Sequence, residues 1–150
     1  MGKAMFVSET QHTLDDKGRL VLPAKLRKDF LNDFYALIDF DHCISLYSEE
    51  EYQKRAEPIM SLSTFSSDAR KLKRLFFGNS MRCKLDGNGR LLLPKVFLDK
   101  AHIDKEVILV GVWDHLELWD AKTYKDNELK DDDDYEALAQ KMSDEGKRNG

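Results

Sequence analysis

Hydrophobic and polar positions follow a pattern that occurs twice along the chain. Alternating segments at residues 6–14 and 77–85 predict β-strands. Each leads through a short polar segment into an apolar run, Leu20-Val21-Leu22 or Leu91-Leu92-Leu93, which predicts a second strand. Two further pairs of strands are predicted, at 35–40 with 43–47 and at 107–112 with 116–119, joined by turns at 41–42 and 114–115.

Helices are predicted from capping residues and apolar spacing. Pro23 and Pro94 each suit the first turn of a helix, because proline lacks only an N–H that would be unpaired there. Ser48 with Glu51 forms a Ser-x-x-Glu capping pattern, and Asp120 is the N-cap candidate at the equivalent place in the second half.

Between the halves, Ser66 or Ser67 is expected to cap a helix from 68 to about 77. Its expected inner face holds Ala69, Leu72 and Phe76, and its outer face holds Arg70, Lys71, Lys73 and Arg74. Near the C-terminus, Ala137, Leu138 and Met142 have helical spacing after a run of aspartates at 131–134 that is too charged to pack. A weak, partly detached helix is predicted there.

The two halves are related by a direct repeat. Leu14–Pro23 aligns with Leu85–Pro94 at an offset of 71, and seven of the ten positions are identical. Further on the offset becomes 72, so that Ala36-Leu37-Ile38 meets Ile108-Leu109-Val110. One copy alone is too small to bury its strands well. We therefore expect both copies to share one core as an intrachain pseudo-dimer.

Charge is distributed unevenly over the 150 residues, whose formal net charge is −4. Residues 126–150 hold nine acids and four bases, whereas residues 1–125 hold 19 acids and 20 bases. The acidity therefore belongs to a tail and does not exclude a polyanionic partner for the body. The apolar runs are far shorter than the roughly 20 residues of a membrane helix, and the start has no secretory apolar stretch. A cytoplasmic protein without a membrane segment is expected.

Catalytic and metal-binding patterns find little support. No serine lies in a Gly-x-Ser-x-Gly elbow, and the glycines of 87–90 lack the remainder of a phosphate-binding loop. Cys43 and Cys83 are expected to be buried small hydrophobes, and the four histidines have no chelating spacing. We therefore expect no enzyme activity, no cofactor, no metal and no small-molecule substrate.

The strongest candidate for chemistry is the duplicated segment before the apolar run. Asp15 and Gly18, like Asp86 and Gly89, are explained by turn formation. In one interpretation the arginine that ends each segment pairs with that aspartate as a surface or buried brace, although a turn does not require it. A planar guanidinium held at a loop edge can grip phosphate, or guanine in the major groove. Further bases enrich the neighbourhood: Lys17, Lys25, Arg27 and Lys28. The bases of 70–74 form a second basic surface.

With these motifs in register, the sequence resembles the MraZ family of bacterial transcriptional regulators, which are built from two AbrB-like repeats. The resemblance covers Met5 to Tyr124 and leaves the acidic tail outside. Its supporting features are Phe76-Phe77-Gly78, Val107-Ile108-Leu109-Val110-Gly111 and Leu116-Glu117-Leu118-Trp119-Asp120.

The resemblance implies an α+β fold of tandem AbrB-like swapped-hairpin β-barrel repeats with short helices. The expected parts are repeat 1 at 5–52, linker helices at 53–76, repeat 2 at 77–124 and an acidic, partly disordered tail at 125–150. The protein is expected to form a homo-oligomeric ring in the cytoplasm, associated with the nucleoid. The ring would bind double-stranded DNA at promoter direct repeats upstream of the division and cell-wall gene cluster.

The DNA-contacting residues implied by the resemblance come from both loops: Asp15, Lys17, Arg19, Asp86, Asn88 and Arg90. The second copy has Gly87-Asn88 where the first has Asp16-Lys17, so it lacks the extra base and equal contact by both copies is in doubt. The alternative function is an AbrB-like antitoxin or assembly scaffold that binds a protein partner through its acidic tail.

Overall fold

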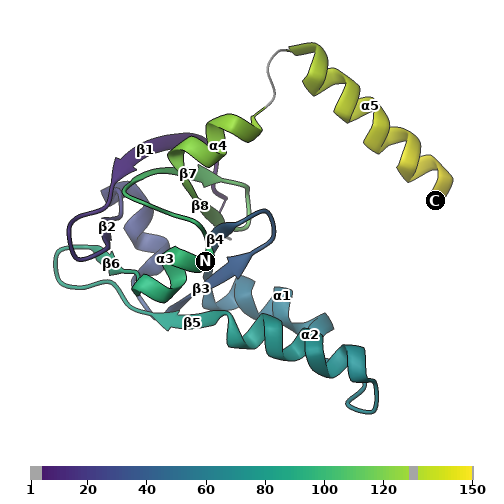
Figure 1. Ribbon diagram of the computed structural model, residues 1–150, viewed down its shortest axis with the longest axis horizontal. Coiled ribbons are helices and arrows are strands. Elements are labelled where there is room, and N and C mark those ends of the chain that lie inside the picture. The colour runs from purple at the N-terminus through teal and green to yellow at the C-terminus, as the bar shows by residue number, and fades with distance from the viewer. Residues whose placement is uncertain (1–4, 129–131, 150) are drawn as a thin grey trace.

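The computed structural model describes residues 5–128 and 132–149. In these ranges the order of elements in the first half is largely repeated in the second (Figure 1). The strands are β1 (Glu9–Thr13), β2 (Arg19–Val21), β3 (Phe34–Asp39), β4 (Cys43–Ser48), β5 (Ser80–Cys83), β6 (Arg90–Leu92), β7 (Glu106–Gly111) and β8 (Leu116–Asp120). The helices are η1 (Ala24–Phe30), α1 (Glu49–Met60), α2 (Ser67–Gly78), α3 (Lys95–Lys100), α4 (Ala121–Asn127) and α5 (Asp132–Asn149).

The predicted caps begin three of these helices. The Ser48 hydroxyl accepts a hydrogen bond from the Glu51 N–H at 3.3 Å, at the start of α1. Ser66, rather than Ser67, caps α2 through the N–H of Ala69, and the Asp120 carboxylate caps α4. These side chains satisfy N–H groups that a helix leaves unpaired at its start.

Three local predictions are corrected. The segment after Pro23 is a 3₁₀-helix, η1, whereas the equivalent segment after Pro94 is the short α-helix α3. The predicted strand at 77–85 starts only at Ser80, because α2 continues through Gly78 and keeps those residues helical. The predicted strand at 6–14 is interrupted: Phe6 forms an isolated bridge with Trp113, and β1 begins after Ser8, whose φ is 72°.

The strands form a six-stranded antiparallel sheet and a separate two-stranded ribbon. The sheet order is β1-β7-β8-β4-β3-β5, and β2 pairs with β6. The order is symmetric about the β4–β8 pair, so the first strand of each copy pairs with the third strand of the other copy. The chain is thus a mixed α+β protein made of two repeats that exchange strands.

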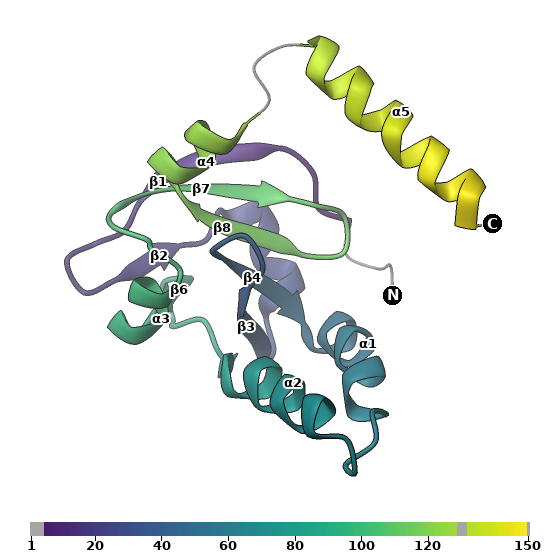
Figure 2. The same cartoon turned by 45° about the vertical axis from the view of Figure 1, so that its right-hand side comes forward.

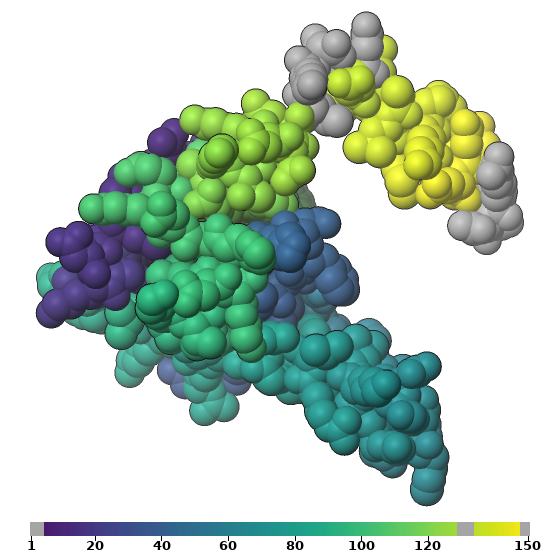
Figure 3. All heavy atoms as spheres, in the orientation of Figure 1, coloured from purple at the N-terminus to yellow at the C-terminus, as the bar shows by residue number. Residues whose placement is uncertain are grey.

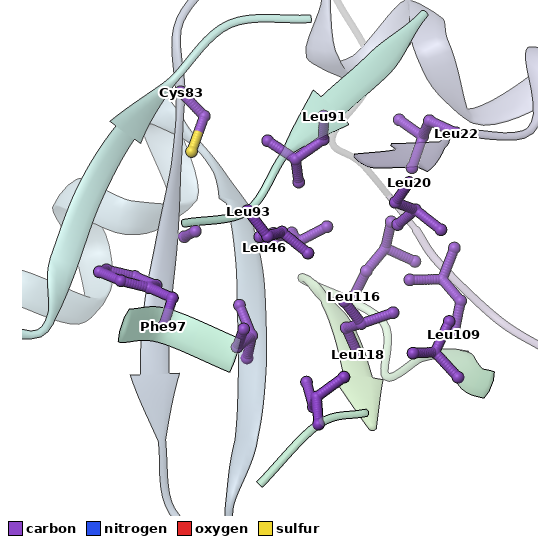
Figure 4. Close-up of a cluster of buried hydrophobic side chains, with 14 of the residues drawn as sticks. Leu20, Leu22, Leu46, Cys83, Leu91, Leu93, Phe97, Leu109, Leu116 and Leu118 are labelled. Atoms are coloured by element: carbon purple, nitrogen blue, oxygen red, sulfur yellow. The ribbon is translucent and has the colours of Figure 1, made fainter. Parts of the chain in front are cut away.

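Both copies contribute to one hydrophobic core, as expected for an intrachain pseudo-dimer. Leu20, Leu22 and Leu46 of the first copy meet Leu91 and Leu118 of the second (Figure 4), and each is at most 2% exposed. Burial of aliphatic side chains from both copies in one cluster stabilises the two halves together rather than separately.

The repeat offset changes in the middle of each copy. The core-facing positions of β3 are Phe34 and Ala36, and those of β7 are Val107 and Leu109, which gives an offset of 73 rather than the predicted 72. A slip of one residue along a strand moves every side chain to the other face, so the predicted alignment of 36–38 with 108–110 is wrong.

The offset rises from 71 at the loops to 73 here, because Val107 lies 13 positions after Pro94 whereas Phe34 lies 11 positions after Pro23. It then falls by one, because the next turn is shorter in the second copy. The N–H of Val112 bonds to the carbonyl oxygen of His115, leaving a two-residue turn at 113–114 instead of the predicted 114–115. The first copy uses the longer turn of residues 40–42 between Asp39 and Cys43. The offset is therefore 72 after this turn, where Ile44 and Leu116 share the core.

The helices at the end of each copy are placed differently (Figures 1 and 2). In the first copy α1 packs on β3 and β4, and α2 packs on α1. An ion pair between Arg55 of α1 and Asp39 of β3, at 2.9 Å, holds this helical hairpin on the sheet. In the second copy α4 covers β7 and β8, whereas α5 extends away from the body as a separate lobe (Figure 3).

Two expectations about helices are settled by these placements. A helix does form near the C-terminus, and it starts at Asp132, inside the aspartate run. In α2, Ala69 and Phe76 are buried as predicted, but Leu72 is 40% exposed. None of the helices in the described ranges combines the length and apolar character needed to cross a bilayer.

Candidate functional site

The loop between β1 and β2 is organised around the Asp15 carboxylate. Its Oδ1 accepts hydrogen bonds from the backbone N–H groups of Lys17 and Arg19, both at 2.9 Å. Its Oδ2 accepts a hydrogen bond from Arg19 Nε at 2.7 Å. The Arg19 N–H, together with that side chain, stabilises the ionised carboxylate and holds the pKa of Asp15 below its ordinary value. The carboxylate therefore stays charged and fixes both the turn and the guanidinium.

The loop between β5 and β6 repeats this geometry. Asp86 Oδ1 accepts from the N–H groups of Asn88 and Arg90 at 2.9 and 3.0 Å, and its Oδ2 accepts from Arg90 Nε at 2.8 Å. The Arg90 N–H is again the main cause that lowers the pKa of Asp86. In each loop the aspartate engages Nε, and within the described residues no further hydrogen bond involves the arginine's two terminal amino groups.

Both loops require a glycine. Gly18 and Gly89 have φ values of +80° and +73°, a left-handed conformation that disfavours other residues. A Cβ at Gly18 would lie 2.9 Å from the carbonyl oxygen of Leu93, and one at Gly89 would clash with the side chain of Arg27. Each glycine also gives its carbonyl oxygen to an N–H just beyond the other copy's strand, so the loops are locked to one another.

The two arginines lie on the outer face of the β2–β6 ribbon. Arg19 pairs with Leu92, and Val21 pairs with Arg90. The strands alternate, so Leu20 and Leu91 point into the core while these four side chains face outward. The outer face of the ribbon is defined by Arg19, Val21, Arg90 and Leu92. In each of its two cross-strand pairs an arginine lies opposite an aliphatic residue, so the two arginines are diagonal neighbours.

A residue outside the predicted set lies beside the second loop. Arg27 of η1 donates from Nε to the carbonyl oxygen of Leu22 at 2.8 Å, and its side chain lies against Gly89. At the equivalent place beside the first loop stands Leu98, whose Cδ1 would be 3.4 Å from a Cβ on Gly18. The second loop lacks a base at Asn88 but has a guanidinium of the first copy next to it.

The structure therefore brings some predicted residues together and separates others. The arginines share the ribbon, and the exposed Lys17 and Asn88 lie in the loops at its ends. The bases of 70–74 lie on α2, at the far end of the molecule from the ribbon (Figure 1). Val21 and Leu92 were assigned only to strands, although strict alternation around Leu20 and Leu91 predicts that both face outward. In the described ranges no three metal-ligating side chains converge.

These features define a class: an α+β protein in which two copies of one unit exchange strands, share a core and present twin aspartate-braced arginines on one ribbon. A family model described as "MraZ protein, putative antitoxin-like" matches the chain twice, at residues 5–75 and 76–146. The chain belongs to the MraZ family. The second match includes most of the acidic tail, which lies beyond the segment from Met5 to Tyr124 that carries the resemblance in sequence.

Related proteins agree with this assignment over nearly the whole chain. A protein of Moorella thermoacetica named "Transcriptional regulator MraZ" is 38% identical over 93% of this chain and 98% of its own length. Proteins of the same name from Limosilactobacillus fermentum and Mycoplasmoides gallisepticum are 36% and 35% identical, over 90% and 94% of this chain and 94% and 99% of their own.

Proposed function

We propose that this protein is a transcriptional regulator that binds double-stranded DNA sequence-specifically through the outer face of the β2–β6 ribbon and its two loops. The observation that carries the proposal is the pair of arginines, each braced through Nε at 2.7 or 2.8 Å with its terminal amino groups left for a ligand. The names of the related proteins support the same role.

The chemistry of the ribbon suits the major groove of DNA. That groove, about 12 Å wide, admits a two-stranded ribbon, and an arginine gripping O6 and N7 is the commonest specific contact to guanine. Arg19 and Arg90 supply two guanidinium groups for such contacts. Val21 and Leu92, which are 52% and 56% exposed, offer apolar contacts to thymine methyl groups. Lys17 adds a phosphate contact that carries no sequence preference. Asp15, Asp86 and Asn88 shape the loops that hold these groups.

A single ribbon makes few contacts, so we propose that assembly provides the affinity. A homo-oligomeric ring of AbrB-like swapped-hairpin repeats presents several ribbons to successive direct repeats, which raises the effective concentration of each without new contacts. We propose that these repeats lie in the promoter of the division and cell-wall gene cluster, where the ring acts in the cytoplasm at the nucleoid.

Fluorescence anisotropy with a fragment of the protein's own upstream region tests the proposal, against a shuffled fragment at the same salt concentration. We expect tighter binding to the upstream fragment and its loss on Arg19→Ala. Lys122→Ala, which removes one exposed positive charge from α4, is the matched control and should bind as the parent does. Equal affinity for both fragments, or parent-like binding by Arg19→Ala, contradicts the proposal.

A second candidate is supported by the family description, which includes the term antitoxin-like. In this case the acidic C-terminal segment, whose helix carries Asp144 and Glu145, binds a basic protein partner. Purification of the tagged full chain from its own cells distinguishes the two functions. A small basic protein recovered at equal stoichiometry favours the antitoxin, whereas specific enrichment of the upstream DNA favours the regulator.

A further inference from the structure

An apolar groove lies along the hairpin of α1 and α2. It has a volume of about 640 Å³ and runs between β3 and the two helices. Its walls are mainly Phe40, Pro58, Ile59, Leu72 and Leu75. Phe40 is 76% exposed and Leu75 is 62% exposed, although both are large hydrophobes. A concave apolar surface of this kind marks an interaction site.

A second unpartnered apolar surface lies on α5. Tyr135, Leu138 and Met142 are spaced three and four residues apart, which places them on one face of the helix. Each of them is at least half exposed, and the described side chains of the helix pack on no core residue of the same chain. An amphipathic helix with an uncovered apolar stripe is the usual occupant of an apolar groove.

Charge matches the two surfaces to each other. Helix α2 carries four bases and one acid, and among the described residues Lys71, Lys73 and Arg74 make no ion pair. Helix α5 carries six acids and three bases. Lys71 is the direct neighbour of Leu72 at the groove wall, so an acidic helix in the groove meets positive charge along the α2 rim.

We propose that the apolar stripe of α5 docks into the α1–α2 groove of a neighbouring copy of this chain. The contact joins two different surfaces, so it is head-to-tail, and such contacts close into rings when the rotation between copies permits. The inference thus rests on the proposed ring and names the contact that builds it. It also gives the acidic segment a role within the assembly.

The position of α5 favours a second copy over the chain's own groove. Helix α4, from which α5 continues, packs on β7 and β8, whereas the groove is bounded by β3 of the other repeat. In two views of the molecule, α5 extends from the α4 side and α2 from the opposite side (Figures 1 and 2). The helix therefore lies apart from the groove of its own chain, and its exposed stripe is accessible to another copy.

Cysteine cross-linking between two co-expressed, differently tagged chains tests the contact directly. One chain carries Met142→Cys and the other carries Leu75→Cys; the native Cys43 and Cys83 are buried. With a mild added oxidant we expect a disulfide-linked pair that contains both tags. Gln140→Cys, on the opposite side of α5, is the control and should link at least tenfold less. A third sample is a single chain that carries both substitutions. A disulfide that forms only within that chain, or no disulfide in any sample, overturns the proposal.

Light scattering separates this inference from the proposed function. Leu138→Asp and Met142→Asp should reduce the assembly to single chains or dimers, while Gln140→Asp should keep the parent mass. These side chains lie outside the described core clusters, so the two stripe variants should keep the far-ultraviolet circular dichroism spectrum of Gln140→Asp. A parent ring that survives both stripe substitutions overturns the docking and leaves the ring standing. A monomeric parent overturns both.

Discussion

The loops at Asp15–Arg19 and Asp86–Arg90 have nearly identical frames in different surroundings. Corresponding aspartate hydrogen bonds differ by no more than 0.1 Å. The first loop carries its own additional base, Lys17, and has Leu98 beside its glycine, whereas the second carries Asn88 and has Arg27 there.

This difference shows which parts of the motif are local and which are shared. Aspartate, glycine and arginine set the backbone within each loop, so they occur in both copies. The additional positive charge comes from the loop itself in one case and from the other repeat in the second. The expectation that the second loop lacks a neighbouring base therefore holds along the sequence but not in space.

Of the differences between the two loops, removal of the arginines should have the largest effect on DNA affinity. A bidentate arginine–guanine contact is worth about 1–3 kcal/mol, so Arg19→Ala should weaken binding about 5- to 150-fold for each engaged loop. Arg90→Ala should cost less, because its loop has Asn88 in place of Lys17 and the neighbouring Arg27 is tied through Nε to the carbonyl oxygen of Leu22, so this loop has fewer free groups for DNA. Anisotropy titrations with the upstream fragment measure both effects. If both variants fold, assemble and bind as the parent does, the DNA surface lies elsewhere.

The two glycines should differ in what their replacement costs. Both substitutions to alanine place an L-residue at positive φ, which costs about 1–2 kcal/mol. Gly18→Ala should cost more than Gly89→Ala, because it meets the backbone carbonyl of Leu93, whereas the side chain of Arg27 can move aside. Urea unfolding monitored by circular dichroism measures the difference. A larger loss of stability for Gly89→Ala would show that Arg27 is held rigidly.

Exchanging the neighbouring charges should change affinity without changing specificity. Lys17→Ala and Arg27→Leu each remove one base near one loop, and each should lower the slope of log affinity against log salt by about 0.9 for every phosphate that is no longer neutralised. Asn88→Lys, combined with Arg27→Leu, should restore the slope. Lys122→Ala serves as the remote control. A change in preference between the upstream and shuffled fragments would mean that these bases read sequence rather than phosphate.

A smaller effect is expected near the symmetric centre of the sheet, where His115 and Cys43 occupy equivalent positions. Burial acts to lower the pKa of His115, but the Glu117 carboxylate, 3.6 Å from its Nε2, and a hydrogen bond with Asp114 outweigh it, and the pKa is raised. Protonated His115 therefore stabilises the fold below about pH 6.5, and this contribution is lost as the pH rises through the raised value. Burial raises the pKa of Cys43, so its thiol stays neutral.

Unfolding free energies of the parent and His115→Gln, measured from pH 6 to 9, test this difference. The parent should lose stability with rising pH relative to the variant, whose curve should be flatter. The variant also loses the stacking of the His115 ring on the Tyr47 ring, whose centroids are 4.5 Å apart. This loss shifts the whole variant curve without changing its slope. Parallel curves would show that His115 has the same pKa in the folded and unfolded chain.

The sequence alone predicted the features that depend on neighbours along the chain. Caps at Ser48 and Asp120, the aspartate-glycine turns and the apolar strands follow from residues a few positions apart. The duplication was also visible, because seven identities in ten positions survive around the loops. The shared core followed from the small size of each copy.

Only the tertiary structure decided which residues of one copy meet the other. The shift to an offset of 73 in β3 and β7 depends on which face of each strand reaches the core, and a one-residue difference in turn length reverses that face. Pairing of β1 with β7 and the approach of Arg27 to Gly89 bring together residues more than 60 positions apart. Such contacts depend on the packing of both repeats around one core, and the composition and spacing of a single segment do not specify that packing.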